Sequence, residues 1–162
     1  MKFIAEKSAF KYLCDDFTRK LNKSAWDKIV EMLENGNLFS ERETLKQLKQ
    51  DIIDVECLEL LEKNKKSFGS LTEKEAVVLG EMMRNHDFDF IVNTPQIQQR
   101  RDHEGLPFVI AIAKAESKST TLVYRKNSPF ANQITSICRK ENIQCLEVED
   151  MLLKIQKPSI NI

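Results

Sequence analysis

The stretch TTLVYRKNSPFANQITSICRKENIQCL (residues 120–146) decides the fold class. Residues 120–124 are apolar and rich in β-branched side chains, so they are predicted to form a buried strand. A helix is expected from Pro129 or Phe130 to about Lys140, and a further short strand at residues 144–146. Strands that alternate with helices are typical of a parallel sheet. The sequence therefore predicts an α/β fold with a short central parallel sheet and helices on both faces.

Upstream, the chain carries repeated helix-start signals, in which a side-chain oxygen caps N–H groups of the first turn. They are Ser24, Ser40 with Glu43, and Thr72 with Glu75, and Pro107 suits the first turn of another helix. The remaining predicted elements are a strand at 2–5, helices over 9–21, 25–35 (ending at Gly36) and 51–63, helices after Ser40, Thr72 and Pro107, a strand at 88–92, and a helix over 149–155.

Composition sets limits on the function. The 162 residues have 41% hydrophobic and 31% charged side chains, as expected of one globular domain, assigned to residues 1–157 with a short tail at 158–162. Lys plus Arg (25) balances Asp plus Glu (25), so the net charge of the chain would not attract a polyanion such as nucleic acid. Apolar runs are too short for a membrane span or a signal-peptide core. A cytoplasmic protein without membrane contact is expected.

Cysteines and histidines give no metal or catalytic motif. Cys14, Cys57, Cys138 and Cys145 lie in apolar stretches without a CxxC pair and are interpreted as buried free thiols. His86 and His103 are interpreted as solvated loop or helix-end residues. There is no GxxxxGK[ST], GxGxxG, HExxH or GxSxG pattern, so nucleotide hydrolysis, dinucleotide binding and the common hydrolase sites have no support.

Five segments carry a family resemblance when they are taken in order. They are FIAEKSAF (3–10), Trp26-Asp27, GNLFS (36–40), PFVIA (107–111) and CRKENIQC (138–145). Together they resemble the PIN-domain nucleases, and most closely a PIN-like bacterial and archaeal branch associated with toxin–antitoxin genes. The resemblance covers nearly the whole chain. Members of this family cleave RNA with one or two Mg²⁺ or Mn²⁺ ions held by carboxylates, which implies a crevice at the carboxyl ends of the strands.

The four acidic positions implied by the resemblance are mostly changed in this chain. Glu6 occupies the first, with Ser8 as its partner, and Gln47 occupies the second. The third falls on Leu106 and the fourth on Arg125 or Lys126. One carboxylate beside a cation cannot neutralise two divalent ions, since Mg²⁺ and Mn²⁺ need several oxygen ligands. No cofactor is therefore expected, and Lys126 or Arg125 is predicted to pair with Glu6 in place of a metal.

Three interpretations remain open. The first is a degenerate PIN-like domain that binds a protein, such as an antitoxin-like protein or a sibling PIN subunit, or RNA. The second is a Mg²⁺- or Mn²⁺-dependent ribonuclease that uses Glu6 with relocated carboxylates from Glu43, Asp102 and Glu104. The third is an unrelated small α/β protein.

Two further expectations concern surfaces. A local basic patch of Arg100, Arg101, Lys114, Lys118, Arg125 and Lys126 would border the crevice and attract phosphate. The pair Met82-Met83, with Val78 and Leu79, would suit a homodimer interface.

Overall fold

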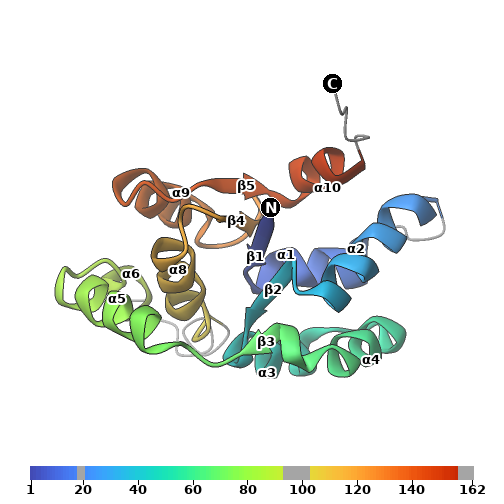
Figure 1. Cartoon of the computed structure of the whole chain (residues 1–162), viewed down its shortest axis with the longest axis horizontal. Helices are drawn as coiled ribbons and strands as arrows, with labels where there is room; N and C mark the ends of the chain where they lie inside the picture. Colours follow the sequence, from blue (N-terminus) through green and yellow to red (C-terminus); the bar gives the residue numbers. More distant parts are fainter. Residues whose placement is uncertain (18–20, 93–102, 157–162) are drawn as a thin grey trace.

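Five short strands form one parallel sheet in the order β3-β2-β1-β4-β5 (Figure 1). The computed structural model describes residues 1–17, 21–92 and 103–156. The strands are β1 (Lys2–Ala5), β2 (Leu38–Glu41), β3 (Phe68–Gly69), β4 (Thr120–Tyr124) and β5 (Cys145–Glu147). All four strand pairs are parallel, with Phe3 opposite both Leu38 and Thr121. The predicted fold class is confirmed.

Helices cover both faces of this sheet. They are α1 (Lys7–Lys11), the π-helix η1 (Tyr12–Asp16), α2 (Lys23–Asn35), α3 (Arg42–Asp51), α4 (Val55–Lys63), the 3₁₀ turn η2 (Lys65–Ser67), α5 (Glu73–Arg84), α6 (Asp89–Val92), α8 (Leu106–Ala115), α9 (Ala131–Lys140) and α10 (Val148–Gln156). In Figure 1, α5, α6 and α8 lie to the left of the sheet and α1, α2 and α4 to the right. Within the described part of the chain, no helix has both the length and the apolar character needed to cross a membrane.

The core has two parts because side chains of a strand point alternately to opposite faces. Phe3 and Ala5 pack with α1–α4 and α10, whereas Ile4 packs with α5, α6, α8 and α9. All three side chains are buried. β1 is therefore the central strand of the sheet, covered on both faces.

Local signals predicted several helix ends correctly. Thr72 and Glu75 form the expected capping box at the start of α5, and Pro107 lies in the first turn of α8. Gly36 ends α2 with φ of 79°, the left-handed conformation that glycine adopts without strain. α2 begins one residue before Ser24, so that serine lies inside the first turn and is not the cap.

The helix predicted after Ser40 is present as α3, with Leu45 and Leu48 buried, but the prediction that Ser40 and Glu43 cap it is wrong. Ser40 lies within β2, and its hydroxyl donates to the carbonyl oxygen of Ala5 at 2.7 Å. Glu41 is the N-cap of α3, and its carboxylate accepts from the Glu43 N–H at 2.7 Å. Pairing with β1 thus overrides the local capping pattern.

Three other predicted elements differ from the structure. In the predicted 9–21 helix, α1 ends at Lys11 and η1 at Asp16, and residues 18–20 lie outside the described part. Asp15, in η1, accepts from the N–H groups of Ile53 and Asp54, so a long-range contact holds this segment. The predicted 51–63 helix begins only at Val55, because Asp54 caps it through the Cys57 N–H at 2.9 Å. Most of the predicted strand at 88–92 is instead a short helix, α6, which begins at Asp89.

Two interpretations of single residue types also need correction. Cys14 and Cys57 form a disulfide with their Cα atoms 5.4 Å apart, whereas Cys138 and Cys145 are free as expected. His103 is buried, with its ring centroid 4.7 Å from that of Phe130, and is not a solvated histidine. His86 is exposed, as predicted, and its Nδ1 lies 3.2 Å from Asp89.

Candidate functional site

The order in which the chain adds strands to the sheet reverses between β1 and β4. From β1 the chain moves outward through β2 to β3, and after crossing back it moves the other way from β4 to β5. In open parallel sheets, ligands bind outside the carboxyl ends of the strands at such a point. Glu6 follows β1 and Arg125 follows β4, so the structure brings these two predicted site residues to the same edge.

Glu6 is the N-cap of α1 and is buried among hydrogen-bond donors. Its Oε1 accepts from the Ala9 N–H at 3.1 Å and from the Ser8 hydroxyl, and its Oε2 accepts from the Ser8 N–H at 3.0 Å. The main-chain N–H of Arg125 adds a further donor. Burial raises the pKa of Glu6, and these hydrogen bonds oppose the rise. The carboxylate therefore holds the β1–α1 turn and the end of β4 together.

The Arg125 guanidinium points to a different acid. Its Nη1 lies 2.5 Å from Oδ2 of Asp16, and its centre lies 4.6 Å from the ring centroid of Tyr12. Burial and then the Glu149 carboxylate raise the pKa of Tyr12, so the phenol is neutral under the cation at neutral pH. The predicted ion pair of Arg125 with Glu6 is wrong, because only the Arg125 main chain reaches that carboxylate. Lys126 is exposed.

The other predicted positions do not gather around Glu6 as a set of acids. Gln47 is buried on α3, and Leu106 is buried in the core at the start of α8. Asp102, Arg100 and Arg101 lie outside the described residues. Glu43 and Glu104 lie at a separate cavity.

That cavity, here called the strand-end crevice, has a volume of about 520 Å³ at the carboxyl ends of β2 and β3. It is lined by Glu41, Arg42, Glu43, Ser70, Leu71, Glu104 and Phe108. Three carboxylates and one guanidinium line it, together with an aliphatic and an aromatic side chain. This combination favours a ligand that has both a positive charge and an apolar part.

Glu41 is the site residue that sequence reasoning missed. Its side chain is 3% exposed, and its Oε1 lies 3.9 Å from Nε of the exposed Arg42. Burial raises the pKa of Glu41, and the Glu43 carboxylate raises it further. Recognition of residues 38–41 as a strand would have placed Glu41 at a carboxyl end.

The two walls of the strand-end crevice touch at Gly105, just before α8. A Cβ atom at this position would lie 2.8 Å from the Thr44 hydroxyl oxygen and 3.1 Å from the Thr44 main-chain nitrogen. The absence of a side chain at Gly105 therefore lets the start of α8 approach α3 closely. Glu104, the neighbour of Gly105, lines the same cavity as Glu41 and Glu43.

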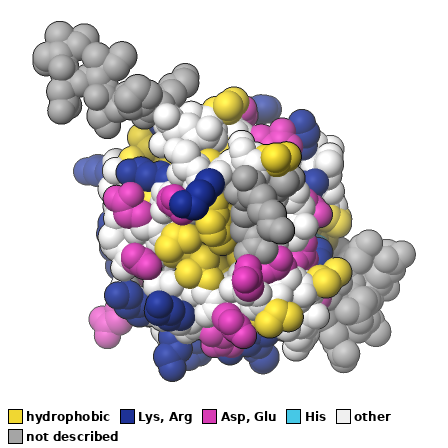
Figure 2. Space-filling view, turned by 90° about the vertical axis from the view of Figure 1, so that its right-hand side faces the viewer, with side chains coloured by type: hydrophobic (Ala, Val, Ile, Leu, Met, Phe, Trp, Pro, Cys, Tyr) yellow, Lys and Arg dark blue, Asp and Glu magenta, His cyan; other side chains and the backbone are white. Residues whose placement is uncertain are grey.

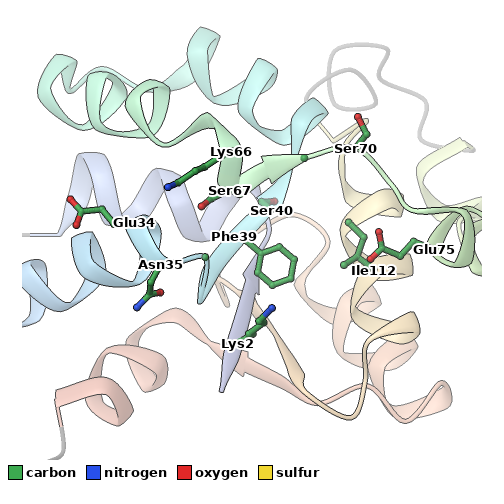
Figure 3. Close-up of a pocket in the computed structure, with 12 residues that line it drawn as sticks. Lys2, Glu34, Asn35, Phe39, Ser40, Lys66, Ser67, Ser70, Glu75 and Ile112 are labelled. Atoms are coloured by element: carbon green, nitrogen blue, oxygen red, sulfur yellow. The ribbon is translucent and has the colours of Figure 1, made fainter.

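A second cavity of about 480 Å³ is lined in part by Phe39 and Ser40 of β2 and shares Ser70 with the strand-end crevice. Figure 3 shows the Phe39 ring near its centre, with Ile112 and Glu75 to one side and Lys2 below. Lys66 and Glu34 also line it, so its charges are balanced. It contains none of the predicted site residues.

The predicted basic patch is not continuous in the described part of the chain. Arg125 pairs with Asp16, and Lys114 pairs with Glu141. Lys118 and Lys126 are exposed. Figure 2 shows Lys and Arg side chains interspersed with Asp and Glu around an apolar area on the face that it displays. At the proposed dimer surface, Met82 is fully buried and Met83 is 57% exposed, so only one of the pair faces outward.

No three His, Cys, Asp or Glu side chains of residues 1–17, 21–92 and 103–156 come close enough together to hold one metal ion. Glu41, Glu43 and Glu104 line one space but do not converge on a point.

Comparison with known proteins gives a family without an assigned activity. No curated protein and no solved structure is similar enough to match the chain. Residues 8–157, however, match a family that is described as a domain of unknown function (DUF4411). Because this match covers most of the sequence, the chain belongs to that family.

Proposed function

We propose that this protein is a PIN-like domain whose acidic site has become structural, and that it binds a protein partner without metal chemistry. The observation that carries the proposal is the position of Glu6. This residue is the one acid at the four positions that the resemblance implies, and its carboxylate is fully buried and bonded to protein donors. A metal ligand would need an oxygen directed toward the ion and away from such donors.

The other implied positions support the same conclusion. The Gln47 side chain has no charge, Leu106 is part of the apolar core, and the Arg125 guanidinium is paired with Asp16. A divalent ion beside Glu6 would therefore meet one carboxylate and the field of a nearby guanidinium. Such a position offers too few anionic ligands for Mg²⁺ or Mn²⁺.

The strand-end crevice favours a protein over RNA as the partner. RNA phosphates would be repelled by Glu41, Glu43 and Glu104, whereas an Arg or Lys side chain would be attracted. Leu71 and Phe108 would contact the aliphatic stem of such a side chain. A partner with a basic helix or loop fits this surface, in the manner of an antitoxin-like protein or a sibling PIN subunit in a cytoplasmic toxin–antitoxin or defence system.

Calorimetric titration of the metal-stripped protein with Mn²⁺ tests the metal-free part of the proposal. We expect no binding heat at millimolar Mn²⁺, for the wild type and for Glu6→Ala alike. Micromolar binding that is lost in Glu6→Ala would overturn the proposal. The exposed Glu59→Ala variant is a matched control for the loss of one carboxylate.

Binding probes test the partner class. A labelled peptide of alternating Arg and Leu, its Glu-for-Arg counterpart and a short single-stranded RNA are compared by fluorescence anisotropy. We expect the Arg peptide alone to bind, with an affinity that falls at least about fivefold in Glu43→Gln or Glu104→Gln and falls with added salt. Binding of the RNA in preference to the Arg peptide would contradict the choice of a protein partner.

A specific observation favours a second candidate, the metal-dependent ribonuclease. Glu43 and Glu104, two of the three relocated carboxylates, do line one cavity, and Glu41 joins them there. This alternative requires cleavage of single-stranded RNA with Mn²⁺ that stops on chelation and is lost in Glu43→Gln but not in Glu59→Ala. Cleavage with these properties would replace the first proposal.

A further inference from the structure

Two free cysteines lie on successive elements at the far edge of the sheet from the strand-end crevice. Cys138 is in the last part of α9, and Cys145 is the first residue of β5. Only residues 139–144 separate them. The inference drawn from these two cysteines does not depend on the function proposed above.

The end of α9 folds the chain back toward its own helix. Asn142 has φ of 55°, a left-handed conformation, and the Ile143 N–H donates to the Cys138 carbonyl oxygen at 2.8 Å. This is the hydrogen bond of a Schellman helix end, in which the second residue past the cap returns to the last turn. Ile143 is buried, which anchors the reversal. The strand that follows is thereby directed back beneath α9.

Strand pairing then fixes which way Cys145 points. Cys145 is opposite Leu122 of β4, and both pack in the core cluster that also contains Cys138. The two thiols interact strongly enough to shift each other's pKa in opposite directions. Both side chains therefore lie close together in this cluster, between α9 and the sheet.

The two thiols differ in acidity and in access. Interaction with the Cys138 thiol lowers the pKa of Cys145 to about 7, and the Arg139 charge contributes to this fall. The same interaction, together with burial, raises the pKa of Cys138. Cys145 is half-buried whereas Cys138 is buried. Near neutral pH, Cys145 therefore carries a larger fraction of thiolate than a thiol with the ordinary pKa of 9.0.

We propose that Cys145 and Cys138 form a thiol-modification site that reacts with low-molecular-weight disulfides such as oxidised glutathione. The Cys145 thiolate attacks one glutathione sulfur, the glutathione S–S bond breaks, and one glutathione thiolate leaves. Cys138 then gives up its proton to solvent and attacks Cys145 Sγ. The mixed disulfide breaks, the second glutathione leaves as a thiolate, and a Cys138–Cys145 disulfide joins α9 to β5. The dithiol is oxidised by two electrons, and oxidised glutathione is reduced to two thiols.

Peptide mapping of the intact folded protein tests this sequence of steps. Trypsin separates the cysteines into the peptides Asn127–Arg139 and Glu141–Lys154. After incubation with oxidised glutathione and trapping of free thiols, we expect a cross-linked pair of these peptides in the wild type. In Cys138→Ala, we expect a glutathione adduct on Cys145 to accumulate instead. In Cys145→Ala, we expect neither product.

Kinetics of the wild type provide a test that needs no variant. With iodoacetamide, Cys145 should react at least about tenfold faster than Cys138 because it is more exposed and more acidic. Far-UV circular dichroism checks that the variants are folded, and the Cys14–Cys57 disulfide is an internal reference that should remain unexchanged. The proposal is overturned by a stable glutathione adduct on wild-type Cys145 without a cross-link, by equal reaction rates of the two thiols, or by a folded Cys145→Ala that accumulates an adduct on Cys138.

Discussion

Replacement of Glu6 by alanine should weaken the fold and leave Mn²⁺ binding unchanged. The change removes the acceptor for the N–H groups of Ser8 and Ala9, for the Arg125 N–H and for the Ser8 hydroxyl. Loss of an N-cap costs about 0.5–2 kcal/mol, and each buried donor left without an acceptor costs about 1–3 kcal/mol. The burial that raises the pKa of Glu6 opposes folding of the charged form, so part of this cost is offset. A net loss of about 2–4 kcal/mol is expected.

Urea unfolding of Glu6→Ala, of Glu6→Gln and of the exposed control Glu59→Ala measures this loss. With an m-value of roughly 2 kcal/mol/M for a chain of this size, the midpoint for Glu6→Ala should fall by about 1–2 M. Glu6→Gln should lie between this variant and the wild type, because an amide retains one acceptor oxygen. Glu59→Ala should stay within about 0.5 kcal/mol of the wild type. A Glu6→Ala protein as stable as the control would refute the structural role of the carboxylate.

Three other perturbations have outcomes that the structure determines. Reduction of the Cys14–Cys57 disulfide, which joins residues 43 apart in sequence, should lower the free energy of unfolding by about 4 kcal/mol, read as a lower urea midpoint in dithiothreitol; an unchanged midpoint would contradict this. Gly105→Ala should cost about 1–3 kcal/mol, because its Cβ would lie 2.8 Å from an α3 side-chain oxygen, whereas Gly80→Ala, with 3.5 Å to its nearest atom, should gain up to about 1 kcal/mol within helix α5. Thermal melts compare the two, and changes of the same sign would count against the close contact. The third perturbation concerns Asp15. Burial alone would raise the pKa of its carboxyl group, but hydrogen bonds from the Asp54 N–H, the Lys11 ammonium and the Ile53 N–H lower this pKa below 3.8. Its stabilisation is thus present above that value and lost as the pH falls through the lower folded value. Asp15→Asn should be less stable than the wild type at neutral pH, and urea curves should converge in acid; a constant difference would argue against the shift.

The fold was predictable where local chemistry determines it. Pro107, the Thr72–Glu75 box and Gly36 each act within one helical turn, and the structure has the helix ends that they predict. Residues 120–124 form a buried strand as expected, because Leu122 and Val123 supply apolar side chains to the cores on its two faces. These elements were sufficient to predict the α/β class.

Long-range contacts account for the errors. The strands β2 and β3 are defined by pairing with neighbouring strands. Without knowledge of that pairing, Ser40 and Glu43 have the spacing of a capping box, so the local sequence does not distinguish a strand from a helix start. The contact of Asp15 with Ile53 and Asp54 joins segments almost forty residues apart, and no spacing rule would reveal it.

The candidate site was predicted in part. Glu43 and Glu104 do line one cavity, but Glu41 was missed because its strand was not recognised. Glu6 was identified as the acid that follows the first strand, and its use as a helix cap depends on donors from Ser8, Ala9 and the distant Arg125. The direction of the Arg125 side chain toward Asp16 depends on the path of η1, which the sequence did not predict.

The central place of β1 has a consequence for how the chain is made. β1 is synthesised before the other four strands, yet its pairing partner on one side is β4, with Lys2 opposite Thr120. At about 5–20 residues per second, the roughly eighty residues between β2 and β4 take about 4–16 s to synthesise. During that interval one edge of an apolar strand is available to any other strand. We expect exchange of β1 between nascent chains to be the main route of misassembly, and a chaperone that shields the first residues to raise the yield of folded protein.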